Sequence, residues 1–188
     1  MPPMPIGSTS PSPLLRLACF AVFAMAGLAH ADPYAEAREL LRAGRAPQAL
    51  EHADRYLAER PRDPQMRFLR GVILTEAGRT DEAMGAFTDL TQEFPELPEP
   101  YNNLAVLHAQ RGELDKARAA LESAVRANPA YATAHENLGD IHVRLAGRSY
   151  ARAAQLTGGA PGLSRKLSLV GELLDPARAA SAPRPHAR

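Results

Sequence analysis

The hydrophobic residues of the chain follow three patterns, and each pattern predicts a different element. Near the N-terminus they form the uninterrupted run LACFAVFAMAGLA over residues 17–29. Near the C-terminus they recur at positions i, i+4, i+7 and i+11 within 163–174, which predicts an amphipathic helix. Between these segments, small residues and prolines return at a constant interval. The chain therefore divides into a leader, a repetitive middle and a C-terminal helix.

The constant interval is 34 residues, and three residue types share it. The positions are Gly44, Gly78 and Gly112, then Ala49, Ala83 and Ala117, then Pro61, Pro95 and Pro129. A period of 34 is typical of a repeated helix–turn–helix unit. We therefore predict a helical array over 32–157, with units near 30–63, 64–97, 98–131 and 132–157.

Each repeated residue has a physical role in such a unit. A glycine after the first helix predicts a turn in the left-handed backbone conformation, which costs glycine least. A proline predicts the end of the second helix, because proline cannot continue one. Small residues predict close approach of the paired helices. On the first helices these are Ala37, Gly71, Ala105 and Gly139.

The first and last units depart from this pattern. In the first unit, Tyr56 stands where a small residue is expected. The fourth unit lacks the turn glycine, and Tyr150 and Ala153 match second-helix positions only if about five residues are deleted. Two alternatives follow for 132–157, namely a helix pair or one long helix.

The C-terminal segment predicts a capping helix followed by a tail. Over 163–174, one helical face carries Leu163, Leu167, Val170 and Leu174. We expect this face to cover the open hydrophobic end of the array. The remaining residues, 175–188, are rich in Pro, Ala and Arg and are expected to be disordered.

Residues 1–31 predict a secretory signal peptide. They carry one charge, Arg16, followed by the apolar run and by Ala29-His30-Ala31, whose small residues a signal peptidase accepts. The run is too short to span a bilayer as an anchor. We expect export by the general route, cleavage after Ala31 and a periplasmic protein without a membrane anchor. Translation could begin at Met1 or at Met4.

Composition and charge narrow the fold and the partners. Hydrophobic residues make up 45% of the chain, but only 5% are aromatic and tryptophan is absent, which favours helices over a β-sandwich. Without its leader the chain carries equal numbers of basic and acidic side chains, which argues against a nucleic-acid partner. The only cysteine, Cys19, lies at the beginning of the leader's apolar run, so neither a lipid anchor nor a disulfide is expected.

With these residues in place, the array resembles the tetratricopeptide repeat family, including small exported members from proteobacteria. In the third unit, Tyr101, Leu104, Ala105 and His108 stand at the places of the W-x₂-L-G-x₂-Y pattern. The resemblance implies an all-α fold. It predicts a short right-handed solenoid of three to four helix–turn–helix units with a C-terminal capping helix.

The stretch HENLGDIH over 135–142 offers a metal site or an architectural interpretation. Two zinc-binding histidines on a helix need a spacing of i, i+4, whereas His135 and His142 are seven apart, or roughly 10 Å along the axis. In the family's pattern His135 occupies the Trp place and His142 the Tyr place, and His108 occupies the Tyr place of the third unit. We therefore interpret them as half-buried packing residues and predict no metal.

The resemblance also implies a site. Arrays of this family line a concave groove with their first helices and accept a peptide or a partner's helix there. The predicted partner groove comprises Phe68, Leu69, Val72, Asn102, Asn103, Val106, Gln110, Glu136, Asn137 and Asp140. Asn103 and Asn137 hold a place at which such arrays often grip a peptide backbone.

The chemistry of this groove favours one kind of ligand over another. The family's carboxylate clamp needs Lys and Arg around those asparagines, whereas Asn102 and Glu136 stand there. That mode is therefore not expected. An apolar middle with an amide-rich and acidic rim suits an amphipathic or mildly basic segment.

No enzymatic signature accompanies the array. A G-x-S-x-G elbow, a G-x-x-x-x-G-K-[ST] loop and a dinucleotide-binding glycine pattern are all missing, so we predict no catalytic residue and no cofactor. We expect a periplasmic adaptor that binds a protein or peptide partner during envelope assembly or maturation. Two alternatives stay open, which are a self-associating structural protein and an accessory protein that binds a metal or a substrate.

Overall fold

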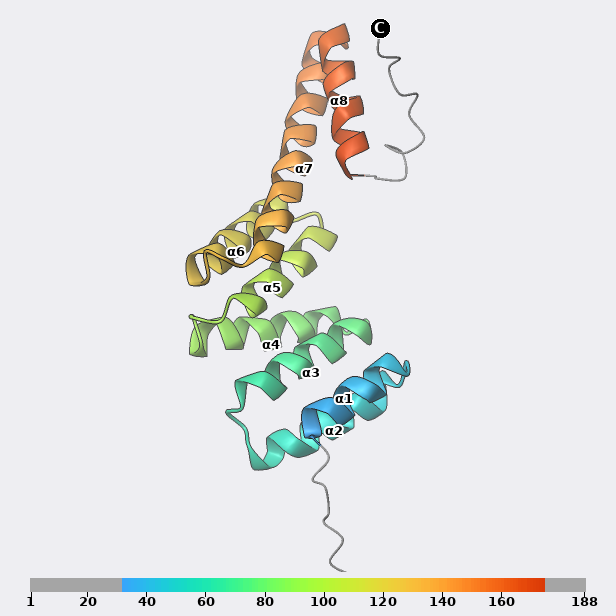
Figure 1. Cartoon of the computed structure of the whole chain (residues 1–188). Coiled ribbons are helices and arrows are strands. Elements are labelled where there is room, and N and C mark those ends of the chain that lie inside the picture. The colour runs from blue at the N-terminus through green and yellow to red at the C-terminus, as the bar shows by residue number, and fades with distance from the viewer. Residues whose placement is uncertain (1–31, 175–188) are drawn as a thin grey trace, which may run out of the picture. The chain divides into compact units, whose positions relative to one another are not determined.

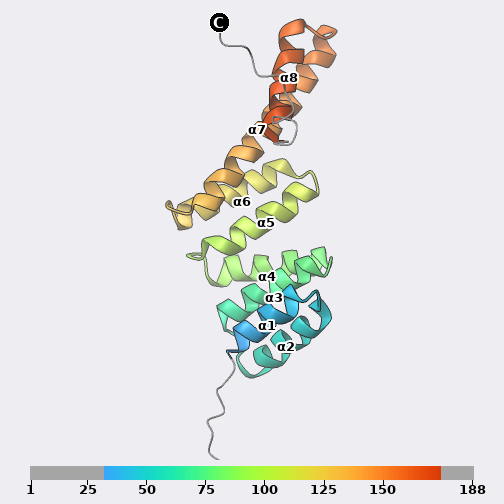
Figure 2. The same ribbon diagram turned by 45° about the vertical axis from the view of Figure 1, so that its right-hand side comes forward.

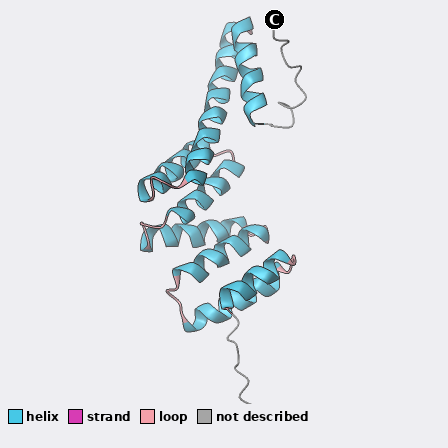
Figure 3. Ribbon diagram, viewed as in Figure 1, coloured by secondary structure: helices cyan, strands magenta, loops and turns pink. Residues whose placement is uncertain are grey.

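The computed structural model describes residues 32–174, and every regular element in that range is a helix (Figure 3). The helices are α1 (Pro33–Arg42), α2 (Ala46–Glu59), α3 (Pro64–Glu76), α4 (Thr80–Glu93), α5 (Pro98–Gln110), α6 (Leu114–Ala127), α7 (Ala132–Thr157) and α8 (Pro161–Leu174). Consecutive helices pack against each other in chain order (Figure 1). The prediction of an all-α helical-repeat solenoid is confirmed.

The period of 34 is visible in the backbone. The second helices α2, α4 and α6 begin at residues 46, 80 and 114. The three turn glycines before them have φ of +70°, +72° and +74°, the left-handed conformation that favours glycine. In each turn the following amide bonds back to the first helix, as Arg45 N does to Leu40 O at 2.9 Å. Each unit therefore closes with the same helix cap.

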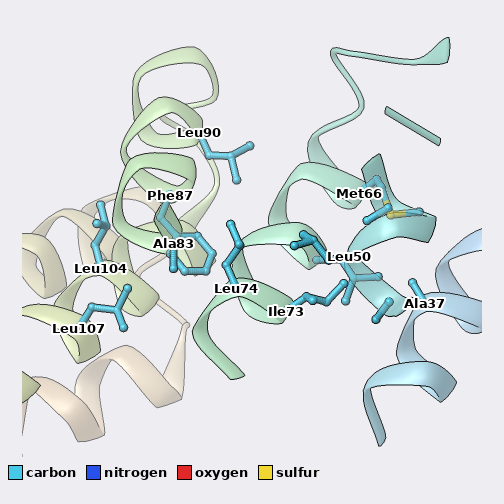
Figure 4. Packing of buried hydrophobic residues seen from close by; sticks show 13 residues of the cluster. Ala37, Leu50, Met66, Ile73, Leu74, Ala83, Phe87, Leu90, Leu104 and Leu107 are labelled. Carbon is cyan, nitrogen blue, oxygen red and sulfur yellow. The ribbon is translucent and has the colours of Figure 1, made fainter. Parts of the chain in front are cut away.

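The first cluster of the hydrophobic core runs from α1 to α5. Ala49, Ala83 and Ala117 are fully buried, which lets the paired helices approach closely. Larger side chains fill the spaces between them, and Figure 4 shows Phe87 on α4 beside Leu74 on α3. A second cluster lies among α5, α6 and α7 and includes Leu121. Packing of these two hydrophobic clusters, rather than covalent cross-links, holds the described region together.

Tyr56, which stands in the first unit where a small residue was expected, belongs to a polar cluster between α1, α2 and α3. Asp63 Oδ2 accepts hydrogen bonds from Tyr34 Oη at 2.5 Å and from Tyr56 Oη at 2.9 Å. Its other oxygen, Oδ1, accepts from Met66 N at 2.9 Å and thereby caps α3. One carboxylate thus joins the first unit to the second.

Helix α7 is continuous over 26 residues, so the fourth unit is one long helix and not a pair. Without a second helix folded back, one face of its first half stays open: a Cβ added at Gly139 would meet nothing within 4 Å. His135 and His142 are accordingly exposed. The expectation that these two histidines are half-buried packing residues is wrong, because the helix that would cover them does not exist. His108 is half-buried, as expected, and its Nδ1 lies 2.6 Å from Glu113 Oε2.

Helix α8 lies beside the second half of α7 in both views (Figures 1 and 2). A Cβ added at Gly147 would lie 2.9 Å from Val170 Cγ1, which marks the contact between the two helices. Helix α8 therefore covers the extension of α7, while Gly139 and His142 in the first half of α7 stay uncovered. The predicted signal peptide over 1–31 and the predicted tail over 175–188 lie outside the described residues.

Candidate functional site

Two pockets lie along the first helices of successive units, and the larger one is formed between α5 and α7. This central pocket has a volume of about 360 Å³. It is lined by Ala105, Val106, Ala109 and Gln110 of α5, by Leu121 of α6, and by Asn137, Asp140, Ile141 and Arg144 of α7. The α7 residues are three to four positions apart and therefore share one helical face.

Two hydrogen bonds between helices set the width of the central pocket. Asn137 Nδ2 donates to Asn102 Oδ1 at 2.8 Å, and Arg144 Nη2 donates to Ala109 O at 3.0 Å. Asn102 is only 7% exposed, so its amide is a buried polar group satisfied by the neighbouring unit. These bonds fix the register of α7 over α5 before any ligand arrives.

The rim of the central pocket carries polar groups that the described region does not satisfy. Within residues 32–174, neither Gln110 nor Asp140 makes a side-chain hydrogen bond or an ion pair. Arg144, one turn after Asp140, points to the α5 carbonyl instead and leaves that carboxylate without a counter-ion. Val106, at 39% exposure, projects apolar surface beside them. The pocket can therefore take an apolar side chain next to a cation or a backbone N–H.

A second pocket lies between the beginnings of α3 and α5. It measures about 280 Å³ and is lined by Pro64, Gln65, Phe68, Leu97, Glu99 and Pro100. We call it the proline pocket. The Phe68 ring packs on the Phe87 ring at a centroid distance of 5.6 Å and an angle of 52°. A buried partner therefore holds the main apolar wall of this pocket in place.

The predicted groove residues separate into three groups. Val106, Gln110, Asn137 and Asp140 meet in the central pocket, and Phe68 lines the proline pocket. Val72, Asn103 and Glu136 lie outside both pockets on the same first helices, half-buried or exposed. Leu69 and Asn102 are corrected, because both are buried and offer a ligand little surface. Leu69 belongs to the hydrophobic core, and Asn102 is covered by Asn137.

Asn103 is already engaged within its own helix. Its Nδ2 donates to Glu99 O at 2.9 Å, one turn earlier in α5. The two asparagines that meet across units are Asn102 and Asn137, so the amide groups of both Asn103 and Asn137, predicted to grip a ligand backbone, already make hydrogen bonds within the described region.

Sequence reasoning overlooked the floors of both pockets. Ala105 was assigned only to helix packing and Ala109 was given no role, yet their small side chains also leave the space that Ile141 and Leu121 enclose. Leu97 and Pro100 lie in the stretch ELPEP, whose proline content signalled only a helix boundary.

Two titratable groups near the central pocket, Tyr131 and Glu113, have shifted pKa values that arise from neighbouring residues of the fold. Burial and then the charge of Glu99 raise the pKa of Tyr131, at the start of α7. A hydrogen bond from His108 and then one from Lys116 lower the pKa of Glu113. Between residues 32 and 174, no three His, Cys, Asp or Glu side chains gather where they could hold a metal ion. In the same range, no helix has both the length and the apolar character needed to cross a bilayer.

Comparison with known proteins agrees with this repeat architecture. Two family models described as tetratricopeptide repeat match residues 34–98 and 74–140. The chain belongs to the tetratricopeptide repeat family. The two matches together extend from residue 34, in α1, to residue 140, in the first half of α7. Tetratricopeptide proteins are generally non-enzymatic scaffolds. A search of curated proteins finds no match.

Several solved tetratricopeptide structures share this fold. The thermophilic protein TTC0263 of Thermus thermophilus is 23% identical over 73% of this chain and 79% of its own, with a TM-score of 0.54. YrrB, a tetratricopeptide protein with an unusual peptide-binding site, is 25% identical over 55% of this chain and 54% of its own, with a TM-score of 0.51. The Yersinia enterocolitica secretion chaperone SycD, in complex with a peptide of the translocator YopD, is 17% identical over 60% of this chain and 91% of its own, with a TM-score of 0.55.

Proposed function

We propose that this tetratricopeptide protein is an exported, non-enzymatic adaptor that holds a segment of a partner protein along α3, α5 and α7. The central pocket carries the proposal, because it combines an apolar floor with Gln110 and Asp140, which have no partners of their own in the described region. The peptide complex of SycD and the peptide-binding site of YrrB support this use of the fold.

The partner segment is expected to be amphipathic and mildly basic. An apolar side chain enters the central pocket, and a second one reaches the proline pocket beside Phe68. The carboxylates of Asp140 and Glu136 then face a Lys or Arg of the segment. Since Asp140 has no cation of its own in the described region, an acidic segment is disfavoured by repulsion.

The N-terminal leader supports a cellular compartment for this activity. A segment with the features of a signal peptide precedes the array, so we place the adaptor in the periplasm, with a role in envelope assembly or maturation. Partners in this compartment are the ones to be sought in an experiment.

The test is co-purification from periplasm with two groove variants and one control. Val106→Glu puts a charge on the apolar wall, and Asp140→Lys reverses the rim charge. Asp89→Lys makes the same reversal on α4, where the residue is exposed and outside both pockets. Each groove variant is expected to lower partner recovery by about tenfold or more, while the α4 variant retains it.

All variants must first show the helical circular dichroism of the wild type. Partner recovery that Val106→Glu leaves undiminished would exclude the central pocket as the binding site. If Val106→Glu reduces recovery but Asp140→Lys does not, the groove is used and the partner segment is not basic.

A further inference from the structure

The C-terminal hairpin of α7 and α8 is incompletely covered. Helix α8 has 14 residues and none of them is buried. Leu169 is 50% exposed and Leu173 is 69% exposed. Two helices alone cannot enclose a hydrophobic core, and the usual solution for such an apolar face is a further layer of helices.

The exposed leucines share one side of the hairpin with an apolar stripe of α7. Lys166 Nζ lies 5.0 Å from the centroid of the Tyr150 ring, so residues flanking this contact lie on the same side of both helices. On α7 the stripe continues at i−4 and i+3 as Ala146 and Ala153, and on α8 it continues as Leu169 and Leu173. We call the set Ala146, Tyr150, Ala153, Leu169 and Leu173 the hairpin face.

Charges along the edge of the hairpin face identify what covers it. Arg165 and Glu172 are seven residues apart, or two helical turns, and therefore lie on the same edge of α8. Within residues 32–174 Arg165 makes no ion pair, and Glu172 accepts only a hydrogen bond from Ser168 Oγ at 3.1 Å. Antiparallel pairing of α8 with a second α8 brings Arg165 of each copy opposite Glu172 of the other. The edge is thus complementary to itself.

We propose that the hairpin face is a self-association surface, on which two copies pair α8 against α8 about a two-fold axis and close a four-helix bundle. A two-fold contact uses each charge pair twice. An anionic membrane surface is a less suitable occupant, because Glu172 would be held against like charge. This surface is separate from the groove, so the proposal stands independently of the partner binding described above.

The pairing is expected to be weak and to depend on concentration. A helix of 14 residues is about 21 Å long. The contact between two such hairpins is smaller than the interface of about 1,200–2,000 Å² that stable complexes bury. Sedimentation velocity of the purified protein from about 1 to 200 µM covers the range in which such a dimer forms.

The first arm of the test removes the apolar contact. Leu169→Glu with Leu173→Glu is expected to weaken the dimer by about a hundredfold. Ala119→Glu is the control, since Ala119 is exposed on α6, outside the hairpin, and should leave association unchanged. Circular dichroism must show equal helix content in all three proteins. A wild type that stays monomeric throughout, or a control that fails equally, overturns the proposal.

The second arm tests the antiparallel geometry with charge reversal. Arg165→Glu alone and Glu172→Arg alone each place like charges opposite each other twice, and each is expected to weaken the dimer by about tenfold. A mixture of the two variants restores opposite charges at both sites, so the mixed dimer should form with the affinity of the wild type. The double variant should do the same.

Two outcomes of the second arm overturn the proposal. If mixing restores nothing, the two charges do not meet across a two-fold axis. If Glu172→Arg strengthens binding to vesicles of anionic phospholipid while Arg165→Glu weakens it, and neither changes sedimentation, the hairpin face serves a membrane surface instead.

Discussion

Gly71 and Gly139 occupy the same place in the second and fourth units, but their surroundings differ, and this difference yields a sharp prediction. A Cβ added at Gly71 would lie 2.6 Å from Phe87 Cε1 and 2.8 Å from Phe87 Cζ. At Gly139 it would meet nothing within 4 Å. The same substitution, glycine to alanine, should therefore destabilise the protein at one position and stabilise it at the other.

The size of the effect follows from two opposing terms. Alanine in a helix interior gains about 0.8–1.0 kcal/mol over glycine at both positions. At Gly71 the added methyl must displace a ring that is fully buried and packed on Phe68, and such overpacking costs about 1–3 kcal/mol. Because the ring has nowhere to move, we expect the upper part of that range. Gly71→Ala should lose about 1–2 kcal/mol, and Gly139→Ala should gain up to about 1 kcal/mol.

Thermal unfolding followed by circular dichroism measures this difference. The two variants should differ in Tm by about 6–9 °C, at about 3 °C per kcal/mol for a domain of this size. In a Phe87→Leu background, Gly71→Ala should cost less, since the smaller side chain vacates the ring position. Equal Tm values for Gly71→Ala and Gly139→Ala would refute the reasoning that the glycine of this place is needed for close helix approach.

Two further predictions concern the polar cluster and the leader. Burial tends to raise the pKa of Asp63, but hydrogen bonds from Tyr34, the Met66 amide and Tyr56 outweigh burial and hold the pKa below its ordinary value. The resulting stabilisation of the fold is present above the ordinary pKa and is lost as the pH falls through the lowered pKa of the folded state. Asp63→Asn should accordingly be less stable at pH 7 by about 1–3 kcal/mol and lose less stability on acidification in urea titrations, a pattern that identical acid profiles would contradict. Intact mass of the protein recovered from periplasm should correspond to a chain beginning at Asp32, and an uncleaved mass would refute cleavage after Ala31.

The fold could be predicted from sequence wherever its determinants are local. The turn at Gly78 and the close packing at Ala83 depend on residue types that act within one unit, so a repeated pattern reveals them. The continuity of α7 was left open, because the fourth unit has Ala146 at the place of the turn glycine, and an alanine there permits a continuous helix without requiring one. The contacts of α7 with another unit could not be predicted at all. Arg144 bonds to Ala109 O and Arg148 Nη2 to Gly112 O at 3.2 Å, and neither carbonyl is visible in the local sequence of α7.

The site was harder to predict for a similar reason. Asn102 and Asn103 are adjacent in sequence, but one residue of helix turns a side chain by about 100°. That rotation directs Asn102 to Asn137 in the next unit and Asn103 to its own backbone. Sequence placed the asparagines on the correct helices, whereas the packing of α7 on α5 decided which of them is available to a ligand.

The unbroken helix α7 connects the central pocket rigidly to the C-terminal hairpin. Asn137 and Asp140 border the central pocket on the same rigid rod that carries Tyr150 and Ala153 in the hairpin face. Seventeen residues of helix separate Asp140 from Thr157, or about 25 Å, so a tilt of about 5° at the pocket moves the far end by about 2 Å. A bound segment that tilts α7 would therefore displace the whole α7–α8 hairpin relative to α5, while the hairpin face itself keeps its composition and geometry.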